Sequence, residues 1–255
     1  MRELPVLACM PGLPVLACAS AAVFLGALVQ GSLGVGLALV SAPVVQIATP
    51  DLMPGSLLLV AAVLAALGAV RELSHTDWYG VSWALAGRIA GTAVASYVIL
   101  VVSGPTLDLL SAGITLGVVS LLAFDPARLA RNRGTLIASG AVAGLTGTTS
   151  SIGGPFIALV YHQEPGPTVR GTLGVFYTAG ALLSLGSLTV VGRLPGEQLA
   201  FGALLLPAVV AGFALSGPVR RQVDDSGRMR GAVLALAVAA ALVLIVRGLV
   251  ALRAG

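Results

Sequence analysis

Charged side chains are scarce in this sequence, and lysine is absent from it. Charged residues make up 9% of the 255 residues, so they cannot cover a water-facing surface. A soluble domain has about 25%. Hydrophobic residues make up 57% of the chain. The composition therefore predicts a multi-pass membrane protein, and the continuous apolar runs favour α-helices over an alternating membrane β-barrel.

Several kinds of functional signal are also missing. The two cysteines, Cys9 and Cys18, are not spaced as a metal or redox pair. The 14 basic residues, all arginine, form no stripe interleaved with aromatic residues, which argues against nucleic-acid binding. The apolar runs contain no paired carboxylates, no Ser/His/Asp set and no His/Glu zinc motif. We therefore expect no enzyme, no cofactor and no bound metal.

Glycine, by contrast, is abundant, with 33 residues. Two glycine-rich stretches, 26–43 and 140–155, interrupt segments that are otherwise apolar enough to lie in a membrane. Glycine costs roughly 1 kcal/mol in a helix interior relative to alanine, so each stretch is expected to break its helix. Interrupted helices in matching positions of two halves mark the binding site in many transporters.

The apolar runs predict an all-α polytopic membrane protein with about eight transmembrane segments. The expected segments cover about 14–48, 52–70, 81–102, 107–124, 135–161, 171–191, 199–219 and 231–252. The order of features repeats, and we predict one membrane domain over residues 1–255. It comprises repeat one (about 14–124), a cytoplasmic linker (about 125–134) and repeat two (about 135–252).

The first segment of each repeat is predicted to be broken or re-entrant. Residues 14–48 in one straight helix would reach roughly 52 Å, whereas the hydrocarbon core is about 30 Å thick. If both interrupted segments fold back, arginines divide nine to four between the two sides; if both cross once, they divide eight to five. The positive-inside rule favours folding back, with the arginine-rich loops in the cytoplasm and the two repeats inverted.

The two breaks are the predicted binding site. Unwound backbone exposes N–H groups, and a helix that begins there turns its positive end toward the break, which suits a small anion. Neutral side chains stand beside both breaks. The candidate substrate-binding residues are Gln30, Gly31, Ser32, Gly34 and Gly36 at the first, and Thr146, Thr148, Thr149, Ser150, Ser151, Gly153 and Gly154 at the second. The alternative is that these small residues serve only helix packing.

Arg88 is a further candidate, because it is a charged residue within an apolar segment. An intramembrane charge is a functional hypothesis by default. The alternative is a structural role, in which its side chain reaches the interface near Trp78 or pairs with a carbonyl group.

These motifs suggest a family. The elements Gly34-Val35-Gly36 and Ser151-Ile152-Gly153-Gly154-Pro155, together with Asp77-Trp78 and Gly91, resemble the sulfite exporter TauE/SafE family of bacterial inner-membrane permeases. The resemblance covers about residues 15–250. It implies transport of small sulfur-containing anions such as sulfite, sulfoacetate or other organosulfonates, with the glycines of both breaks framing the site. The chain departs from the fuller family pattern at Leu37, Ala38 and Ser151, where glycines are usual.

The expected function is that of a secondary transporter for a small anion, working by alternating access. The alternatives are a passive anion channel and a membrane assembly subunit without transport. The expected partners are the lipid bilayer, the anionic solute, a coupling ion (H⁺ or Na⁺) and further copies of the chain in a homo-oligomer.

Overall fold

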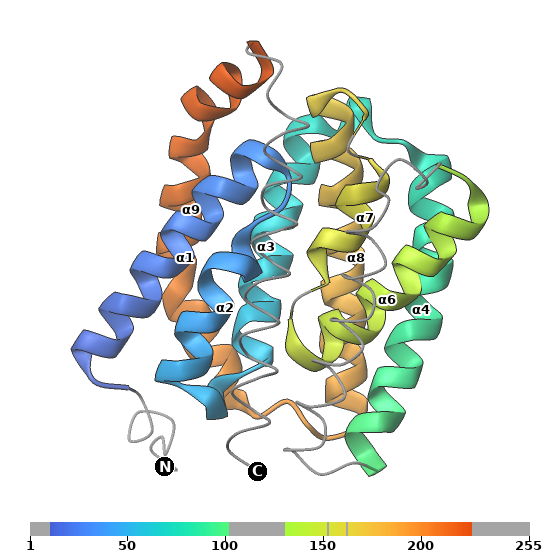
Figure 1. Ribbon diagram of the computed structural model, residues 1–255. Coiled ribbons are helices and arrows are strands. Elements are labelled where there is room, and N and C mark those ends of the chain that lie inside the picture. The colour runs from blue at the N-terminus through green and yellow to red at the C-terminus, as the bar shows by residue number, and fades with distance from the viewer. Residues whose placement is uncertain (1–10, 102–130, 152, 162, 226–255) are drawn as a thin grey trace, which may run out of the picture.

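The computed structural model describes residues 11–101, 131–151, 153–161 and 163–225, and these residues contain helices and no strands (Figure 1). Five helices in this part are long and apolar enough to cross a membrane: Leu13–Leu33, Gly55–His75, Trp78–Val101, Gly166–Val190 and Gly196–Val223. The all-α polytopic prediction is confirmed. The apolar runs expected at 107–124 and 231–252 lie outside the described residues.

The helices fall into two series with the same order. The first comprises α1 (Leu13–Leu33), α2 (Leu37–Ala48), α3 (Gly55–Glu72) and α4 (Trp78–Val101). The second comprises α6 (Arg133–Ser150), α7 (Gly154–Val160), α8 (Gly166–Val190) and α9 (Gly196–Asp225). Each series therefore opens with an interrupted pair of helices and continues with two long ones.

The interruption predicted at each glycine motif is confirmed, and both segments fold back. Gly34 and Gly36 have φ angles of 85° and 144°, which L side chains rarely adopt, so helix α1 ends there. A Cβ atom on Gly26 of α1 would lie 2.9 Å from the carbonyl oxygen of Leu37, the first residue of α2. At the second break Ser151 has a φ angle of 60°. Gly153 there lies against the backbone of Gly147 in α6.

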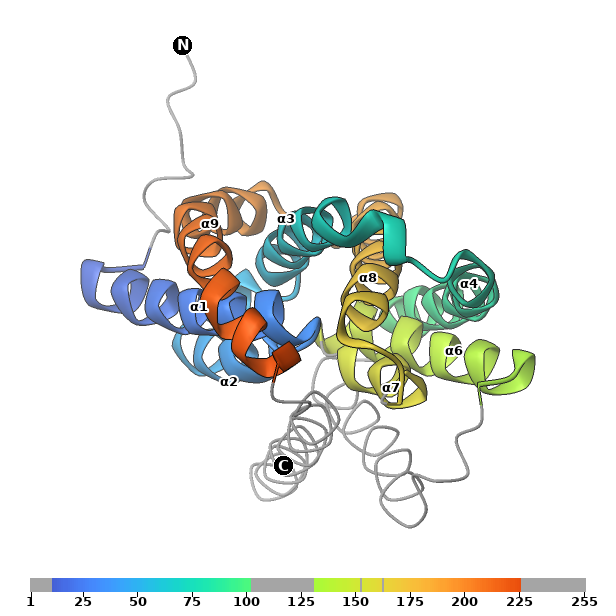
Figure 2. The same ribbon diagram turned by 90° about the horizontal axis from the view of Figure 1, so that it is seen from above.

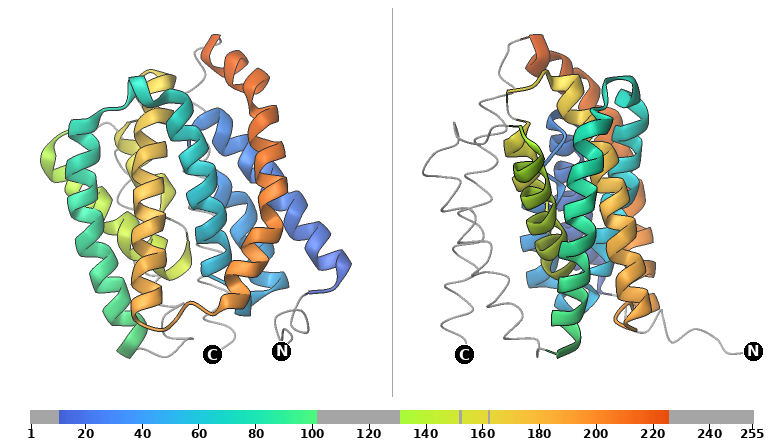
Figure 3. Two further views of the ribbon diagram at one scale, coloured as in Figure 1. Left: turned by 180° about the vertical axis from the view of Figure 1, so that it is seen from behind. Right: turned by 90° about the vertical axis from the view of Figure 1, so that its right-hand side faces the viewer.

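The two hairpins lie on one face of a layer of long helices. Seen from behind, α4, α8, α3 and α9 stand side by side, and the view from above places α1–α2 and α6–α7 along the other face (Figures 2 and 3). Helix α1 rises toward its break in Figure 1, whereas α6 descends toward its own. The breaks are therefore approached from opposite ends of the molecule.

Packing between the series is reciprocal. Helix α1 packs against α9 and helix α6 against α4, while α3 and α8 pack against each other at the centre. One buried core joins α1, α2, α3 and α9, including Val23, Leu57 and Phe201. A second core is formed mainly by α4, α6, α7 and α8, including Leu136 and Phe176. This arrangement is what a two-fold relation between the series produces, and it leaves the two breaks facing each other.

Glycines bring α4 and α6 into unusually close contact. A Cβ atom on Gly87 or Gly91 of α4 would overlap the carbonyl oxygen of Ile137 or Ala141 of α6. On the α6 side, a Cβ atom on Gly140 would overlap a carbonyl oxygen of α4. Small residues allow such backbone contact between membrane helices. The contact fixes the position of α4 beside the second break.

The arginine count assigned four residues wrongly to loops: Arg71, Arg170, Arg220 and Arg221. Helix α3 continues through Arg71 to Glu72, α8 begins at Gly166 and so contains Arg170, and α9 continues past Arg220 to Asp225. The expected segments stopped at these charged residues because an isolated charge is costly in a membrane. In the fold, however, the side chains of Arg71, Arg170 and Arg220 have hydrogen-bond partners at one end of the molecule, so the helices continue through them.

Candidate functional site

A cavity of about 60 Å³ lies where the two breaks meet. It is bordered by the first break and the first turn of α2, by α3, α4 and α8, and by the second break. The lining residues are Gln30, Val35, Gly36, Leu37, Ala38, Leu39, Leu58, Ala61, Arg88, Gly147, Ser151, Gly153, Tyr177 and Ala181. Such a volume has room for a few water molecules or one small anion.

Arg88 is the charged residue of this cavity. Its side chain is 3% exposed, and its guanidinium carbon lies 5.2 Å from the centroid of the Phe176 ring. Its Nε atom has no hydrogen-bond partner among the described residues. Two glycines make room for the guanidinium group: a Cβ atom on Gly147 would lie 3.0 Å from Nη2, and one on Gly180 would overlap Nε. The packing thus holds the cation in place without neutralising it.

The N-terminus of α2 adds to the positive potential. Residues 36–39 line the cavity, so the first turn of α2 faces it. The Gln30 side chain accepts a hydrogen bond from the backbone N–H of Leu37, with Oε1 at 3.1 Å. Gln30 thereby ties α1 to the start of α2 across the break. Backbone N–H groups and the helix dipole favour an anion at this end of a helix.

The balance of charge in the cavity is positive. Of the described residues that line it, Arg88 alone carries a charge, and none is a carboxylate. A buried cation without a charged partner costs several kcal/mol, and a bound anion would offset that cost. The cavity is therefore suited to an anion and unsuited to a cation.

A comparison with known protein families agrees with this chemistry. The family model "Sulfite exporter TauE/SafE" matches residues 19–244. The chain belongs to the sulfite exporter TauE/SafE family. No curated protein and no solved structure matches it. TauE/SafE proteins are membrane permeases, so this chain is a multi-pass membrane protein of a transporter family rather than of an enzyme family.

The residues predicted from the sequence divide between two places in this TauE/SafE fold. Gln30, Gly36, Arg88, Ser151 and Gly153 come together around the central cavity. Gly31 and Gly34 line a second cavity, of about 10 Å³, to which Gln30 also contributes. Ser150 ends α6 and Gly154 begins α7. Their part in binding stays a prediction.

Four predicted hydroxyl groups, those of Ser32, Thr146, Thr148 and Thr149, are bonded within or between helices, and these four residues do not line either cavity. Three of them donate to a backbone carbonyl oxygen one turn earlier in the same helix. The pairs are Ser32 with Leu28 at 2.8 Å, Thr146 with Val142 at 2.8 Å, and Thr149 with Leu145 at 2.9 Å. Thr148 pairs with Ser184 of α8 at 2.8 Å. A hydroxyl group in a helix commonly bonds to the preceding turn, which the one-dimensional pattern does not reveal.

Sequence reasoning did not single out Tyr177 and Gly147, which also line the central cavity. Tyr177 lies in an apolar stretch of α8 that resembles ordinary core. Arg88, three positions before Gly91, could have drawn attention to nearby glycines, but which glycines lie against it depends on how α4, α6 and α8 pack.

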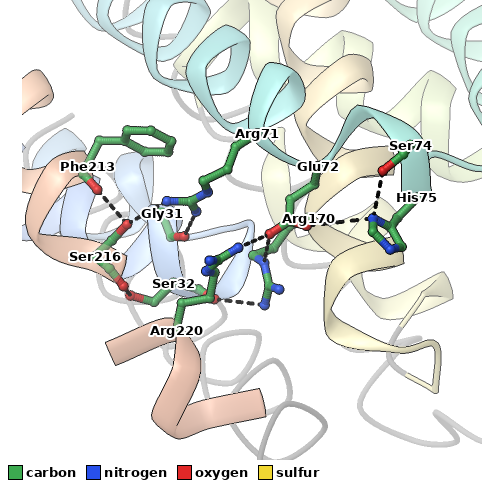
Figure 4. A network of polar contacts seen from close by, with 10 residues as sticks. All are labelled: Gly31, Ser32, Arg71, Glu72, Ser74, His75, Arg170, Phe213, Ser216 and Arg220. Atoms are coloured by element: carbon green, nitrogen blue, oxygen red, sulfur yellow. Dashed lines mark hydrogen bonds and ion pairs between the residues drawn. The ribbon is translucent and has the colours of Figure 1, made fainter. Parts of the chain in front are cut away.

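Sequence reasoning also missed a polar network at the end of the molecule where α1 meets α3, α8 and α9 (Figure 4). Glu72 is 5% exposed and accepts hydrogen bonds from Arg170, at 3.3 Å, and from Arg220. The Nη1 atom of Arg170 donates to the carbonyl oxygen of Ser32 at 3.4 Å. Arg71 donates to the carbonyl oxygen of Gly31, and to Ser216 Oγ at 3.1 Å. Guanidinium groups thus stabilise the C-terminal end of α1 immediately before the first break.

Proposed function

We propose that this TauE/SafE protein is a secondary transporter that moves a small sulfur oxyanion, sulfite or a short organosulfonate, by alternating access. The observation that carries the proposal is the buried Arg88 guanidinium in a cavity bounded by both helix breaks. We place the protein in the bacterial inner membrane, the location that the family resemblance implies.

The anion binds with its oxygen atoms toward Arg88 and the first turn of α2. A guanidinium group donates paired hydrogen bonds to an oxyanion, and these charge-assisted bonds are stronger than neutral ones. The rest of the cavity is largely apolar, with Leu39, Leu58 and Ala61 among its lining residues. That surface suits the short carbon chain of an organosulfonate, whose charged head resembles sulfite.

Transport follows from the position of the site between two hairpins. Each hairpin supplies one wall, so movement of one helix bundle against the other opens the cavity to alternate sides of the membrane. The arginine-rich end, where the network of Figure 4 lies, faces the cytoplasm by the positive-inside rule. A coupling ion, H⁺ or Na⁺, supplies the driving force, and the protein works as a homo-oligomer in the bilayer.

The test is flux of radiolabelled sulfite and of sulfoacetate in proteoliposomes that contain the purified protein. The wild-type protein should give saturable uptake, and Arg88→Gln should lower it at least tenfold, a loss of about 1.4 kcal/mol in binding. Arg193→Gln, at an exposed position in the α8–α9 turn, is the matched control and should transport as wild type. Wild-type uptake by Arg88→Gln with both anions would refute the proposed site.

The same vesicles separate a carrier from the channel and from the assembly subunit. A carrier gives saturable, gradient-coupled uptake without single-channel currents. Ohmic currents would identify a channel, and an absence of flux for every sulfur oxyanion tested would favour a subunit without transport.

A further inference from the structure

We propose that the surface where α4 and α6 begin binds the headgroup of an anionic phospholipid, with Arg133 holding its phosphate group. The side chains that form this lipid site are Arg133 of α6 and Tyr79 and Trp83 of α4. None of the three lines the central cavity. The lipid site is therefore separate from the transported anion and does not depend on its identity.

Arg133 is held in place by α4. It is the first residue of α6, and its Nε atom donates a hydrogen bond to the hydroxyl oxygen of Tyr79 at 2.6 Å. Its guanidinium carbon lies 5.8 Å from the centroid of the Tyr79 ring and 5.1 Å from that of Trp83. The two rings meet edge to face, with their centroids 6.4 Å apart. Two aromatic side chains thus fix the cation at the protein surface.

Arg133 has no carboxylate partner in the described part of the chain, since the side chains that it contacts are both neutral. Arg131, two residues earlier, differs, because its Nη1 atom lies 3.0 Å from Asp77 and 3.5 Å from Glu164. The nearby carboxylates are thus paired with Arg131. Arg133 is exposed and uses its Nε atom for Tyr79, which leaves its two Nη groups available to a ligand. Such a guanidinium group suits the paired oxygens of a phosphodiester.

The surroundings of Arg133 are those of a membrane interface. Helix α4 is long and apolar enough to cross a membrane, and it begins at Trp78. Trp78 and Tyr79 are 58% and 55% exposed, and aromatic residues gather at the level of the lipid headgroups. Further along α4 large apolar side chains are also exposed: Ile89, Val94, Tyr97 and Leu100. An acyl chain can therefore lie along α4 while the phosphate group meets Arg133.

A lipid fits this surface better than a soluble anion does. The exposed apolar side chains of α4 give acyl chains a place that a free phosphate ion cannot use. Helices α4 and α6 lie at one edge of the molecule, where lipid reaches them (Figures 1 and 2). Their first residues lie at the arginine-rich end, which the positive-inside rule places in the cytoplasm. Anionic headgroups of the cytoplasmic leaflet attract basic residues near the membrane surface.

Tryptophan fluorescence tests the site directly. The chain contains two tryptophans, Trp78 and Trp83, and both belong to the start of α4. Bromine atoms on an acyl chain quench a tryptophan only at contact distance. The full-length protein is reconstituted with brominated phosphatidylglycerol or with brominated phosphatidylcholine of the same chains, each mixed with unbrominated lipid. A Trp78→Phe background leaves Trp83, the ring beside the guanidinium group, as the single reporter.

The preference for phosphatidylglycerol over phosphatidylcholine at this site should be about fivefold, which corresponds to about 1 kcal/mol from one arginine. Arg133→Gln should reduce the preference to nearly none. Arg221→Gln, at an exposed position of α9 at the same end of the molecule, removes the same charge and should leave the preference unchanged. Quenching by brominated phosphatidylcholine should be equal in all three proteins, because the contact with the acyl chains stays the same.

Several results would overturn the lipid site: no quenching of Trp83 by either lipid, equal affinity for the two lipids, a preference that persists in Arg133→Gln, or a preference lost as fully in Arg221→Gln. Displacement of the brominated lipid by glycerol phosphate in solution would also overturn it, because the site would then bind a soluble phosphate. The measurement requires no transport. A lipid preference without flux of any sulfur oxyanion would count against the function proposed above and not against the lipid site.

Discussion

The guanidinium group of Arg88 occupies the space that a side chain on Gly180 would fill. A Cβ atom on Gly180 of α8 would overlap the Nε atom of Arg88, which comes from α4. Helix α8 thus carries a glycine at the point where the buried cation lies against it, and Tyr177 and Ala181 on either side line the cavity. The position of the proposed anion-binding group thus depends on a glycine that is not itself among the residues lining the cavity.

A methyl group at that position should displace Arg88. Gly180→Ala is expected to weaken the apparent affinity for the transported anion at least tenfold, about 1.4 kcal/mol, because the guanidinium must move while the helices stay in place. Sulfite uptake in proteoliposomes measures this effect. Gly186→Ala in the same helix is the control, since its Cβ atom would meet nothing within 4 Å. Unchanged affinity in Gly180→Ala would show that the position of Arg88 does not matter for binding.

The first break should not tolerate a side chain at Gly36. Its φ angle of 144° is strained for any L residue, and such strain costs about 1–3 kcal/mol. Gly36→Ala should therefore lower the thermal stability and reduce uptake at least severalfold. Gly217→Ala in α9, where a Cβ atom would meet nothing within 4 Å, should do neither. Wild-type behaviour of Gly36→Ala in both measurements would contradict the described geometry of the break.

The contact between α4 and α6 should also be disrupted by an added side chain. Gly91→Ala introduces a methyl group that overlaps the carbonyl oxygen of Ala141, and overpacking of this kind costs about 1–3 kcal/mol. We expect a lower melting temperature in detergent and a smaller monodisperse fraction in size-exclusion chromatography. Gly68→Ala, in open space on α3, should leave both unchanged. A Gly91→Ala protein as stable as wild type would mean that the two helices are less closely packed than described.

The buried hydroxyl of Thr148 should matter for stability and not for binding. It pairs with Ser184 across α6 and α8, a contact between membrane helices worth about 0.6 kcal/mol on average. Thr148→Val should therefore lower stability slightly and leave the apparent affinity for sulfite within about twofold, less than 0.5 kcal/mol. Ser151→Ala, which alters a residue of the cavity lining, is the comparison. A large loss of affinity in Thr148→Val would show that the threonine hydroxyls contribute to anion binding.

The two helix breaks could be predicted from the sequence because they depend on local chemistry. Glycines at 34 and 36 predict an interruption because they weaken a helix and permit positive φ angles, and both effects act within a few residues. The length of residues 14–48 likewise excludes a single straight span, and the division of the arginines favoured folding back. Arg88 stands out for a similar reason, since a charge in an apolar segment is costly wherever it lies.

The contacts of the threonines and of Arg71 and Arg170 could not be predicted from local sequence. Whether the hydroxyl of Thr148 faces a solute or Ser184 depends on how α6 packs against α8. The sequence pattern does not predict the relative orientation of these two helices. Arg71 and Arg170 read as loop residues because their pairing partners are far away in the chain. Arg170 lies 98 residues from Glu72, with which it pairs.

The sequence by itself thus determined a helical membrane protein with two matching interruptions and one charge between them, because composition and glycine act locally. Only the tertiary structure decided which side chains line the cavity, which hydroxyls are already paired, and that Arg170 and Arg220 both bond to Glu72. Those outcomes depend on long-range packing, in which small residues on one helix set the distance and the rotation of another.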